Sequence, residues 1–234
     1  MFISETFYSI QGEGKLAGVP SFFIRASGCN LRCAWCDTPY ASWNPTGTEI
    51  SVPELLALAR QTPARHVVFT GGEPVIMPDA ELLCHTFAAA GYHITLETAA
   101  TIYKPLNIHL ASLSPKLSNS SPSLGSPYHP DAAKFAPNHD RQRLNPQTIR
   151  AFIGSSPDYQ LKFVVAQESD LVEIEDLLAK LGDIPRSSVL LMPEGTDNLT
   201  LRSRTPWLSE LCKHRGYRFC PRLHIDLYGN KRGT

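Results

Sequence analysis

Short apolar runs alternate along the chain with longer segments in which apolar residues recur at helical spacing. The short runs, such as HVVFT at 66–70 and QLKFVVA at 160–166, are rich in β-branched and aromatic residues, which favour strands buried on both faces. The pattern predicts strands at residues 21–27, 66–70, 92–97, 107–113, 160–166, 188–192 and 217–223.

The segments between these runs carry start and stop signals of helices. Ser51 and Glu54 have the spacing of a capping box, and Pro206 suits the first turn of a later helix. Gly91 and Gly182 each follow a periodic segment, where a glycine commonly ends a helix. We therefore predict helices at residues 51–62, 79–90, 145–153, 168–181 and 205–215.

A strand followed by a helix, repeated about six times, predicts an α/β fold with parallel strands covered by helices. Periodicity does not choose between an open doubly wound sheet and a partial barrel, but in both the functional groups lie beyond the carboxyl ends of the strands. Residues 117–143 depart from the pattern because Ser, Pro, His and Asn dominate there. We interpret the chain as one domain, 1–234, in which 117–143 is a surface insertion: a lid, a partly mobile loop, or an excursion without function.

Composition narrows the function classes. The 22 basic and 22 acidic residues balance, so no broad field favours a nucleic acid or a membrane surface as partner. No apolar stretch approaches the roughly 18 residues of a membrane span, and the polar N-terminal residues do not form a signal peptide. We expect a cytoplasmic protein whose cysteines stay reduced, so the three cysteines at 29, 33 and 36 indicate a metal site.

Cys29, Cys33 and Cys36 form a C-x3-C-x2-C motif in a loop directly after the first predicted strand. Cysteine thiolates are the usual ligands of iron–sulfur clusters, and three thiolates leave one iron of a 4Fe–4S cluster open. An open position distinguishes a reactive metal site from a structural one. The structural alternative is a zinc knuckle with a distant fourth ligand.

This loop resembles the cluster-binding loop of the radical S-adenosylmethionine superfamily, and a second motif agrees. Gly71-Gly72-Glu73-Pro74 follows the next predicted strand, where the superfamily has a GGEP segment that binds the amino group of S-adenosylmethionine. Exposed carbonyls and a carboxylate accept hydrogen bonds from an ammonium, and glycines permit close approach of the backbone. The resemblance implies a partial, open (β/α)6-type barrel, a 4Fe–4S cluster and S-adenosylmethionine as cofactors.

Further segments resemble the 7-carboxy-7-deazaguanine synthase family: ETFYSIQGEG at 5–14, PSFFIR at 20–25, CDT at 36–38, SPK at 114–116 and LHIDLYGN at 223–230. This resemblance implies a radical ring contraction of 6-carboxy-5,6,7,8-tetrahydropterin to 7-carboxy-7-deazaguanine with release of ammonia, in the biosynthesis of queuosine and other 7-deazapurines. It also implies Mg²⁺, a small-molecule pterin substrate, an electron donor such as flavodoxin or ferredoxin, and a homodimer.

The same resemblance assigns roles to individual residues. Cluster ligands are Cys29, Cys33 and Cys36, and the hydroxyl of Thr38 contacts Mg²⁺. The residues aligned with cofactor-binding positions are Trp35, Asp37, Gly72, Glu73, Ser114, Pro115 and Lys116. The residues aligned with substrate contacts, or placed near them, are Ile10, Gln11, Gly12, Glu13, Arg25, Thr70, Glu97 and His224. Arg25 is expected to bind the substrate carboxylate through its planar guanidinium, although it could instead be one half of a buried ion pair.

Two rival functions share the cysteine motif. A glycyl-radical-enzyme activase also carries C-x3-C-x2-C but acts on a protein backbone and needs an open groove for its partner. A non-catalytic iron–sulfur or zinc module would leave the GGEP and SPK segments without a purpose. Cleavage of S-adenosylmethionine by the reduced protein separates both enzymes from the module, and a requirement for a partner protein separates the two enzymes.

Overall fold

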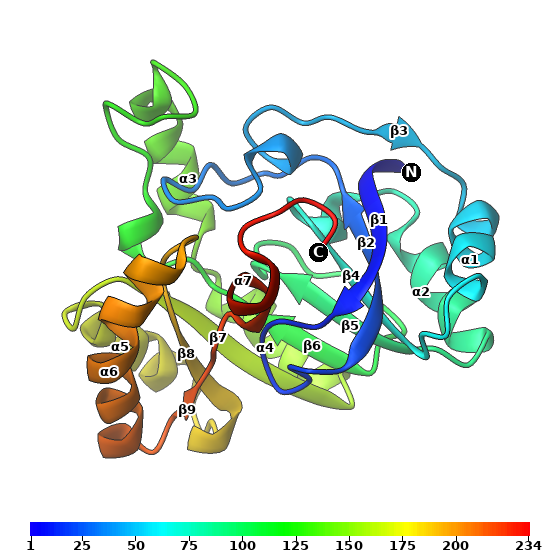
Figure 1. Ribbon diagram of the computed structural model, residues 1–234. Coiled ribbons are helices and arrows are strands. Elements are labelled where there is room, and N and C mark those ends of the chain that lie inside the picture. Colours follow the sequence, from blue (N-terminus) through cyan, green and yellow to red (C-terminus); the bar gives the residue numbers. More distant parts are fainter.

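The computed structural model describes residues 1–234 and contains a single nine-stranded sheet (Figure 1). The strand order is β3-β1-β2-β4-β5-β6-β7-β8-β9, in which β1 runs antiparallel to β2 and every later neighbouring pair from β2 onward is parallel. The strands are β1 (Phe2–Ile10), β2 (Pro20–Ala26), β3 (Thr48–Glu49), β4 (His66–Gly71), β5 (His93–Thr98), β6 (Leu110–Leu113), β7 (Asp158–Val165), β8 (Val189–Pro193) and β9 (Arg218–Phe219). The first and last strands do not pair, so the predicted open, partial barrel is confirmed.

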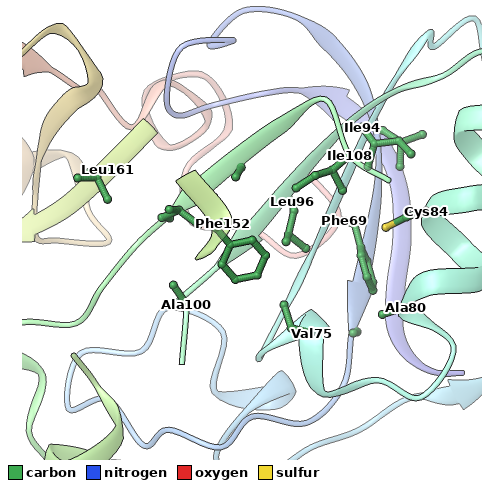
Figure 2. Close-up of a cluster of buried hydrophobic side chains, with 14 of the residues drawn as sticks. Phe69, Val75, Ala80, Cys84, Ile94, Leu96, Ala100, Ile108, Phe152 and Leu161 are labelled. Carbon is green, nitrogen blue, oxygen red and sulfur yellow. The ribbon is translucent and has the colours of Figure 1, made fainter. Parts of the chain in front are cut away.

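Side-chain alternation along the parallel strands separates a hydrophobic core from a cavity. In β4, Val67 and Phe69 belong to the main hydrophobic cluster, whereas Val68 and Thr70 line the cavity on the other face. The same alternation places Phe163 of β7 in the core and Lys162 at the cavity. Figure 2 shows part of this core, in which side chains of the strands meet those of the covering helices. The two-residue period of a strand therefore directs alternate side chains to the helices and to the cavity.

Five helices cover the outer face of the sheet and contribute to its core: α1 (Val52–Arg60), α2 (Ala80–Ala89), α4 (Pro146–Ser155), α5 (Asp170–Leu181) and α6 (Asn198–Arg215). The helix α3 (Ala136–Gln142) belongs to the segment 117–143, and α7 (Leu223–Tyr228) lies at the cavity. The capping box predicted for the first helix is present, because Ser51 accepts a hydrogen bond from the Glu54 backbone and Glu54 accepts one from that of Ser51. No helix combines the length and apolar composition that crossing a bilayer requires.

Two predictions about elements were wrong, and one strand was missed. The N-terminal strand β1 was not predicted, because polar residues such as Ser4, Glu5 and Thr6 interrupt its apolar pattern. The sixth helix begins at Asn198, where the Asp197 side chain caps the backbone N–H of Thr200, so Pro206 lies inside the helix and not in its first turn. The predicted strand at 217–223 is reduced to β9, and Leu223 begins α7.

The Ser/Pro-rich segment 117–143 contains ordered elements. It includes short 3₁₀ helices at Ser118–Ser120 and Ala132–Phe135, followed by α3. Figure 1 shows this green segment beside the blue loop that follows β2, which carries the cysteine motif. Several hydrogen bonds join the two, among them one from the backbone N–H of Ala34 to the carbonyl of Ser120 (2.8 Å).

Because one face of β4 packs in the core and the other lines the cavity, a Val→Ala substitution should lower the free energy of unfolding by different amounts on the two faces. Val67→Ala removes two methyl groups from a closed core and should lower the free energy of unfolding by about 2 kcal/mol. Val68→Ala should cost less than half as much, because the truncated group borders an existing cavity and leaves no new closed void. Urea denaturation of both variants measures this difference, and equal losses would contradict the assignment of the two faces.

Candidate active site

A cavity of about 520 Å³ opens at the carboxyl ends of the parallel strands. Of the site residues predicted from the sequence, all but Glu73 and Pro115 line it. They reach it from β1, the cysteine loop, the ends of β2, β4, β5 and β6, and the segment that begins α7. The sheet thus brings together groups as distant in the sequence as Ile10 and His224, because the carboxyl ends of all its parallel strands lie on the same side.

Cys29, Cys33 and Cys36 all border the cavity and are free thiols. Cys29 and Cys36 pack against a small buried cluster formed by Cys33, Leu31 and Ala99. Burial, the largest effect, raises the pKa of Cys29 to about 12, and burial also raises the pKa values of Cys33 and Cys36. Metal coordination is therefore needed to hold these sulfurs as thiolates.

The surroundings of the sulfurs suit an iron–sulfur cluster. The backbone N–H of Leu31 donates to Cys29 Sγ at 3.3 Å, and the Ser42 hydroxyl lies 3.1 Å from Cys36 Sγ. Such hydrogen bonds and an apolar shell tune a cluster held by thiolates. No group of three or more His, Cys, Asp or Glu side chains is gathered closely enough to hold a single metal ion. The three cysteines, facing one cavity from one loop, fit a 4Fe–4S cluster.

The glycine pair after β4 packs directly on the start of the cysteine loop. The Gly72 backbone N–H donates to the Ala26 carbonyl at 3.1 Å, and a Cβ on Gly72 would lie 2.2 Å from the carbonyl oxygen of Gly28. Gly71 has a φ of 141°, which only glycine adopts readily. The close contact between the two loops thus explains why glycine occupies both positions.

Glu73 does not face the cavity. Its carboxylate is fully buried and accepts hydrogen bonds from the Thr98 hydroxyl (2.7 Å) and the backbone N–H groups of Ala99 (3.0 Å) and Val75 (3.2 Å). Burial raises its pKa despite these bonds. Glu73 therefore fixes the end of β5 relative to the GGEP turn, and Pro115 is likewise buried beneath the cavity wall.

The other residues aligned with cofactor binding surround the cysteines. The Lys116 ammonium donates to the carbonyl and hydroxyl oxygens of Ser114 at 2.7 and 2.8 Å. Trp35 packs on the small cluster that contains Val164 and Met192, and its indole N–H donates to Asn119 at 3.1 Å. These contacts give the cysteine side of the cavity a cation, hydroxyls and an aromatic wall.

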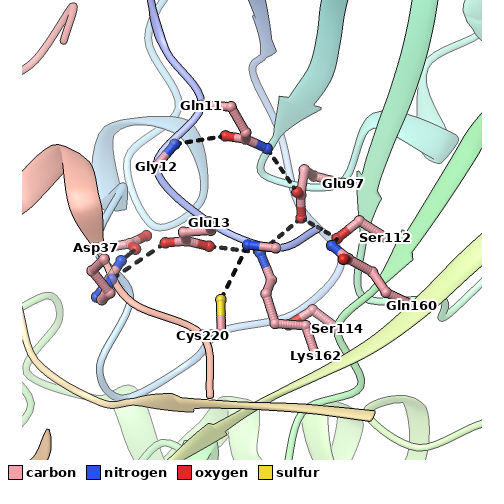
Figure 3. A network of polar contacts seen from close by, with 12 residues as sticks. Gln11, Gly12, Glu13, Asp37, Glu97, Ser112, Ser114, Gln160, Lys162 and Cys220 are labelled. Atoms are coloured by element: carbon pink, nitrogen blue, oxygen red, sulfur yellow. Dashed lines mark hydrogen bonds and ion pairs between the residues drawn. The ribbon is translucent and has the colours of Figure 1, made fainter. Parts of the chain in front are cut away.

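A chain of ion pairs and hydrogen bonds forms one polar wall of the cavity (Figure 3). The buried ammonium of Lys162, 3% exposed, binds Glu13 Oε2 at 2.6 Å and Glu97 Oε2 at 2.9 Å. Glu97 also accepts from Ser112 Oγ at 2.8 Å and from Gln11 Nε2 at 3.3 Å. The network joins the loop after β1 to the ends of β5, β6 and β7.

Arg222 extends this polar wall to the cysteine loop. Its guanidinium binds Asp37 and lies 3.2 Å from Glu13 Oε1. Burial opposes ionisation of Glu13, but Lys162 and Arg222 outweigh it and hold the pKa of Glu13 well below its usual range. For Asp37, burial is likewise outweighed by Arg222, and its pKa is lowered. Both carboxylates are therefore ionised at neutral pH.

Arg25 combines the two roles that the sequence left open. Its Nε donates to Glu5 Oε1 at 2.6 Å, so it forms a partly buried ion pair, and its guanidinium also lines the cavity. Glu5 further accepts from the Tyr40 hydroxyl at 2.9 Å and from Arg232 Nε at 3.1 Å. Because Glu5 engages only Nε, the two terminal nitrogens of Arg25 are left for another acceptor.

The remaining predicted residues complete the lining. Thr70 at the end of β4, Ile10 at the end of β1 and Thr38 after the cysteines border the cavity. The imidazole of His224 packs so closely on Gly12 that a Cβ there would lie 2.0 Å from His224 Nδ1. Burial is the main cause that lowers the pKa of His224, although Glu13 opposes it.

Sequence reasoning missed several residues of the site. Lys162 could have been found, because it is a lone cation within the apolar strand β7. Glu5, Tyr40 and Arg222 carry no local signal, since their roles depend on long-range contacts. The segment after α7 also lines the cavity through Asn230, Lys231, Arg232 and Thr234.

Comparisons with known proteins agree with this geometry. A model of the Radical SAM superfamily matches residues 23–114, which include both the cysteine loop and the GGEP turn. Together with the open parallel barrel, this match defines the chain as a radical S-adenosylmethionine enzyme, a class whose members hold a 4Fe–4S cluster and S-adenosylmethionine.

Full-length relatives define the family. The chain is 44% identical to 7-carboxy-7-deazaguanine synthase of Rhodopirellula baltica, across 100% of this chain and 89% of the relative. It is 45% identical to the synthase of Halobacterium salinarum, across 97% of this chain and 90% of the relative. The crystal structure of QueE from Escherichia coli aligns with a TM-score of 0.68 and 28% identity, covering 95% of this chain and 94% of that one. The chain belongs to the 7-carboxy-7-deazaguanine synthase family.

Proposed function

We propose that the chain catalyses the reaction of its family, the radical ring contraction of 6-carboxy-5,6,7,8-tetrahydropterin to 7-carboxy-7-deazaguanine with release of ammonia. The observation that carries the proposal is that one cavity is lined both by the cysteine motif and by a polar wall of amide, carboxylate and ammonium groups. A cavity of this size suits a small heterocycle, and it places that molecule next to the cofactor-binding loop.

Cys29, Cys33 and Cys36 would hold the cluster, and Trp35, Asp37, Gly72, Ser114 and Lys116 would surround S-adenosylmethionine. When bound, the reduced cluster and S-adenosylmethionine would together supply a carbon radical able to remove a hydrogen atom from the substrate. Glu73 and Pro115 do not line the cavity and would support this site from within the protein; Glu73 does so by fixing the backbone at Ala99. The carbonyls of the glycine turn and the oxygens of Ser114 are acceptors suited to an ammonium.

The polar wall suits the pyrimidine edge of a pterin. Gln11 and Glu97 present an amide and a carboxylate at the cavity, and these groups can pair with the donors and acceptors of that edge. Lys162 holds Glu13 and Glu97 in fixed positions before any ligand binds. Backbone groups of residues 10–12, with Thr70 and His224, complete the set of proposed substrate contacts.

Arg25 is suited to the substrate carboxylate. Glu5 fixes the guanidinium through Nε, and the terminal nitrogens remain able to form charge-assisted bonds with an anion. The second arginine on Glu5, Arg232, leaves the Arg25–Glu5–Arg232 group with one excess positive charge, which matches one carboxylate.

Further components of the proposal follow from the family resemblance. Mg²⁺ would bind the Thr38 hydroxyl together with substrate and water oxygens, because a hard cation takes oxygen ligands. A flavodoxin or ferredoxin would reduce the cluster, the chain would form a homodimer, and a cytoplasmic location would keep its free cysteines reduced.

The direct test is an anaerobic assay of the reconstituted, reduced protein with S-adenosylmethionine, Mg²⁺ and 6-carboxytetrahydropterin, analysed by mass spectrometry. We expect 7-carboxy-7-deazaguanine to form without matching consumption of S-adenosylmethionine. Accumulation of 5′-deoxyadenosine without that product would leave the radical enzyme class in place, contradict the pterin substrate and favour an activase.

Arg25→Ala tests the assigned carboxylate contact. A charge-assisted hydrogen bond contributes roughly 1.5–3 kcal/mol, so the affinity for the pterin should fall about ten- to hundredfold. Arg25→Lys should recover only part of this loss, because lysine lacks the planar fork. The exposed Arg60 of α1 provides the control variant Arg60→Ala, which should bind normally. A loss of iron from Arg25→Ala, with unchanged pterin affinity, would show that Arg25 is structural.

A further inference from the structure

We propose that the segment 117–143 is a clamp that holds the cysteine loop, residues 29–36, in the conformation that receives the cluster. This inference rests on the proposed function only in that the loop binds a 4Fe–4S cluster. The loop has no regular secondary structure, so helix and sheet hydrogen bonds do not fix the positions of its cysteines. Its contacts to the clamp supply much of the fixation that secondary structure would otherwise provide.

Two backbone N–H groups of the loop donate to the clamp. The N–H of Arg32 donates to His139 Nδ1 at 3.1 Å, and the N–H of Ala34 donates to the carbonyl of Ser120 at 2.8 Å. These residues flank Cys33 on both sides. The backbone N–H groups on either side of the central cysteine are therefore held by the clamp, while the Arg32 guanidinium bonds the carbonyls of Cys29 and Leu31 within the loop.

His139 forms a complete hydrogen-bonded relay within the clamp. Because Nδ1 accepts from Arg32, the ring proton lies on Nε2, which donates to the Ser120 hydroxyl at 2.9 Å. The Ser120 hydroxyl in turn donates to the Leu117 carbonyl at 2.6 Å. His139 is 1% exposed and both of its ring nitrogens are used, so its position is tightly defined.

A second set of contacts holds the end of the loop. The Tyr128 hydroxyl donates to the carbonyl of Cys36 at 2.7 Å, and the Tyr128 ring stacks on Trp43 with centroids 5.7 Å apart. Trp43 Nε1 donates to the carbonyl of Cys33 at 3.0 Å. The Arg32 guanidinium lies over the ring of Phe135 in the clamp, 5.7 Å from its centroid. The clamp thus contacts the loop at Asn30, Arg32, Ala34, Trp35 and Cys36, so its contacts extend along most of the loop.

The clamp is itself anchored to the barrel. Asn119 donates to Asp170 at the start of α5 (2.7 Å) and to the carbonyl of Val164 in β7 (3.1 Å), while accepting from Trp35. Arg143, at its other end, pairs with Glu173 of α5. Contacts at both ends therefore tie the loop to the sheet, and this support would keep the three cysteines at the cavity wall.

Iron release from the reconstituted holoenzyme to a strong ferrous chelator, under anaerobic conditions, tests the clamp. Chelation requires local opening of the loop, so weaker clamping should accelerate it. Tyr128→Phe removes one hydrogen bond but keeps the ring, and iron release should become about two- to tenfold faster. His139→Ala leaves the buried N–H of Arg32 without a partner, and release should become about tenfold faster or more. The electron paramagnetic resonance spectrum of the reduced cluster should broaden in both variants.

Matched controls remove equivalent contacts far from the loop. Tyr217→Phe loses a hydrogen bond of 2.8 Å from its hydroxyl to Glu175. His66→Ala removes a buried histidine at the amino end of β4, where it hydrogen-bonds Ser21 and Thr95. Both controls should release iron within about twofold of the wild-type rate. Unchanged iron release in Tyr128→Phe and His139→Ala, or equal acceleration in the controls, would overturn the proposal. Because these readouts do not involve the pterin, a failed substrate assignment leaves this test intact.

Discussion

The buried ammonium of Lys162 is the contact on which the site depends. It binds a carboxylate from the loop after β1 and another from the end of β5, and so joins two segments that are remote in sequence. Burial disfavours the charged form, but Glu13 and Glu97 outweigh it and raise the pKa of Lys162 above its usual value. Loss of this one charge would leave two carboxylates facing each other in a largely buried wall, a strongly destabilising arrangement.

Strand alternation explains how a polar wall can exist inside a well-packed barrel. On β7, Leu161, Phe163 and Val165 enter the hydrophobic core, while Lys162 and Val164 between them border the cavity. The same division on β2 separates the apolar Ile24 from Arg25. Stability therefore resides on one face of the sheet and chemistry on the other, so the cavity can carry charges without interrupting the core.

Local motifs predicted the cofactor side of the site well and the remainder less completely. The cysteines and the glycine turn lie within short segments, and the cavity brings them together as expected. Glu73 belongs to the same turn but points into the protein, because Thr98 and Ala99 take up its carboxylate. No pattern in the sequence could show that Arg222 would pair with Asp37, since that contact requires the folded barrel.

The secondary structure was also predictable in some segments and not in others. The parallel strands were predictable because both of their faces are largely buried and their sequences are continuously apolar. The β1 strand escaped notice because polar residues such as Ser4, Glu5 and Thr6 interrupt its apolar pattern. The clamp segment also has few apolar residues, yet side-chain and backbone hydrogen bonds to the cysteine loop order it. Amino-acid composition alone gives no sign of such hydrogen bonds.

The measurement that tests the role of Lys162 most directly is amide hydrogen exchange in wild-type protein and Lys162→Met. The backbone N–H groups of Gly12, Gly14 and Lys15 each donate to a side chain, so the polar wall should protect them. An unpaired buried charge costs roughly 3–5 kcal/mol, and we expect exchange in this loop to accelerate about tenfold or more in the variant while α2 is unaffected. Unchanged exchange at these three amides would contradict the conclusion that Lys162 holds the loop after β1 in place.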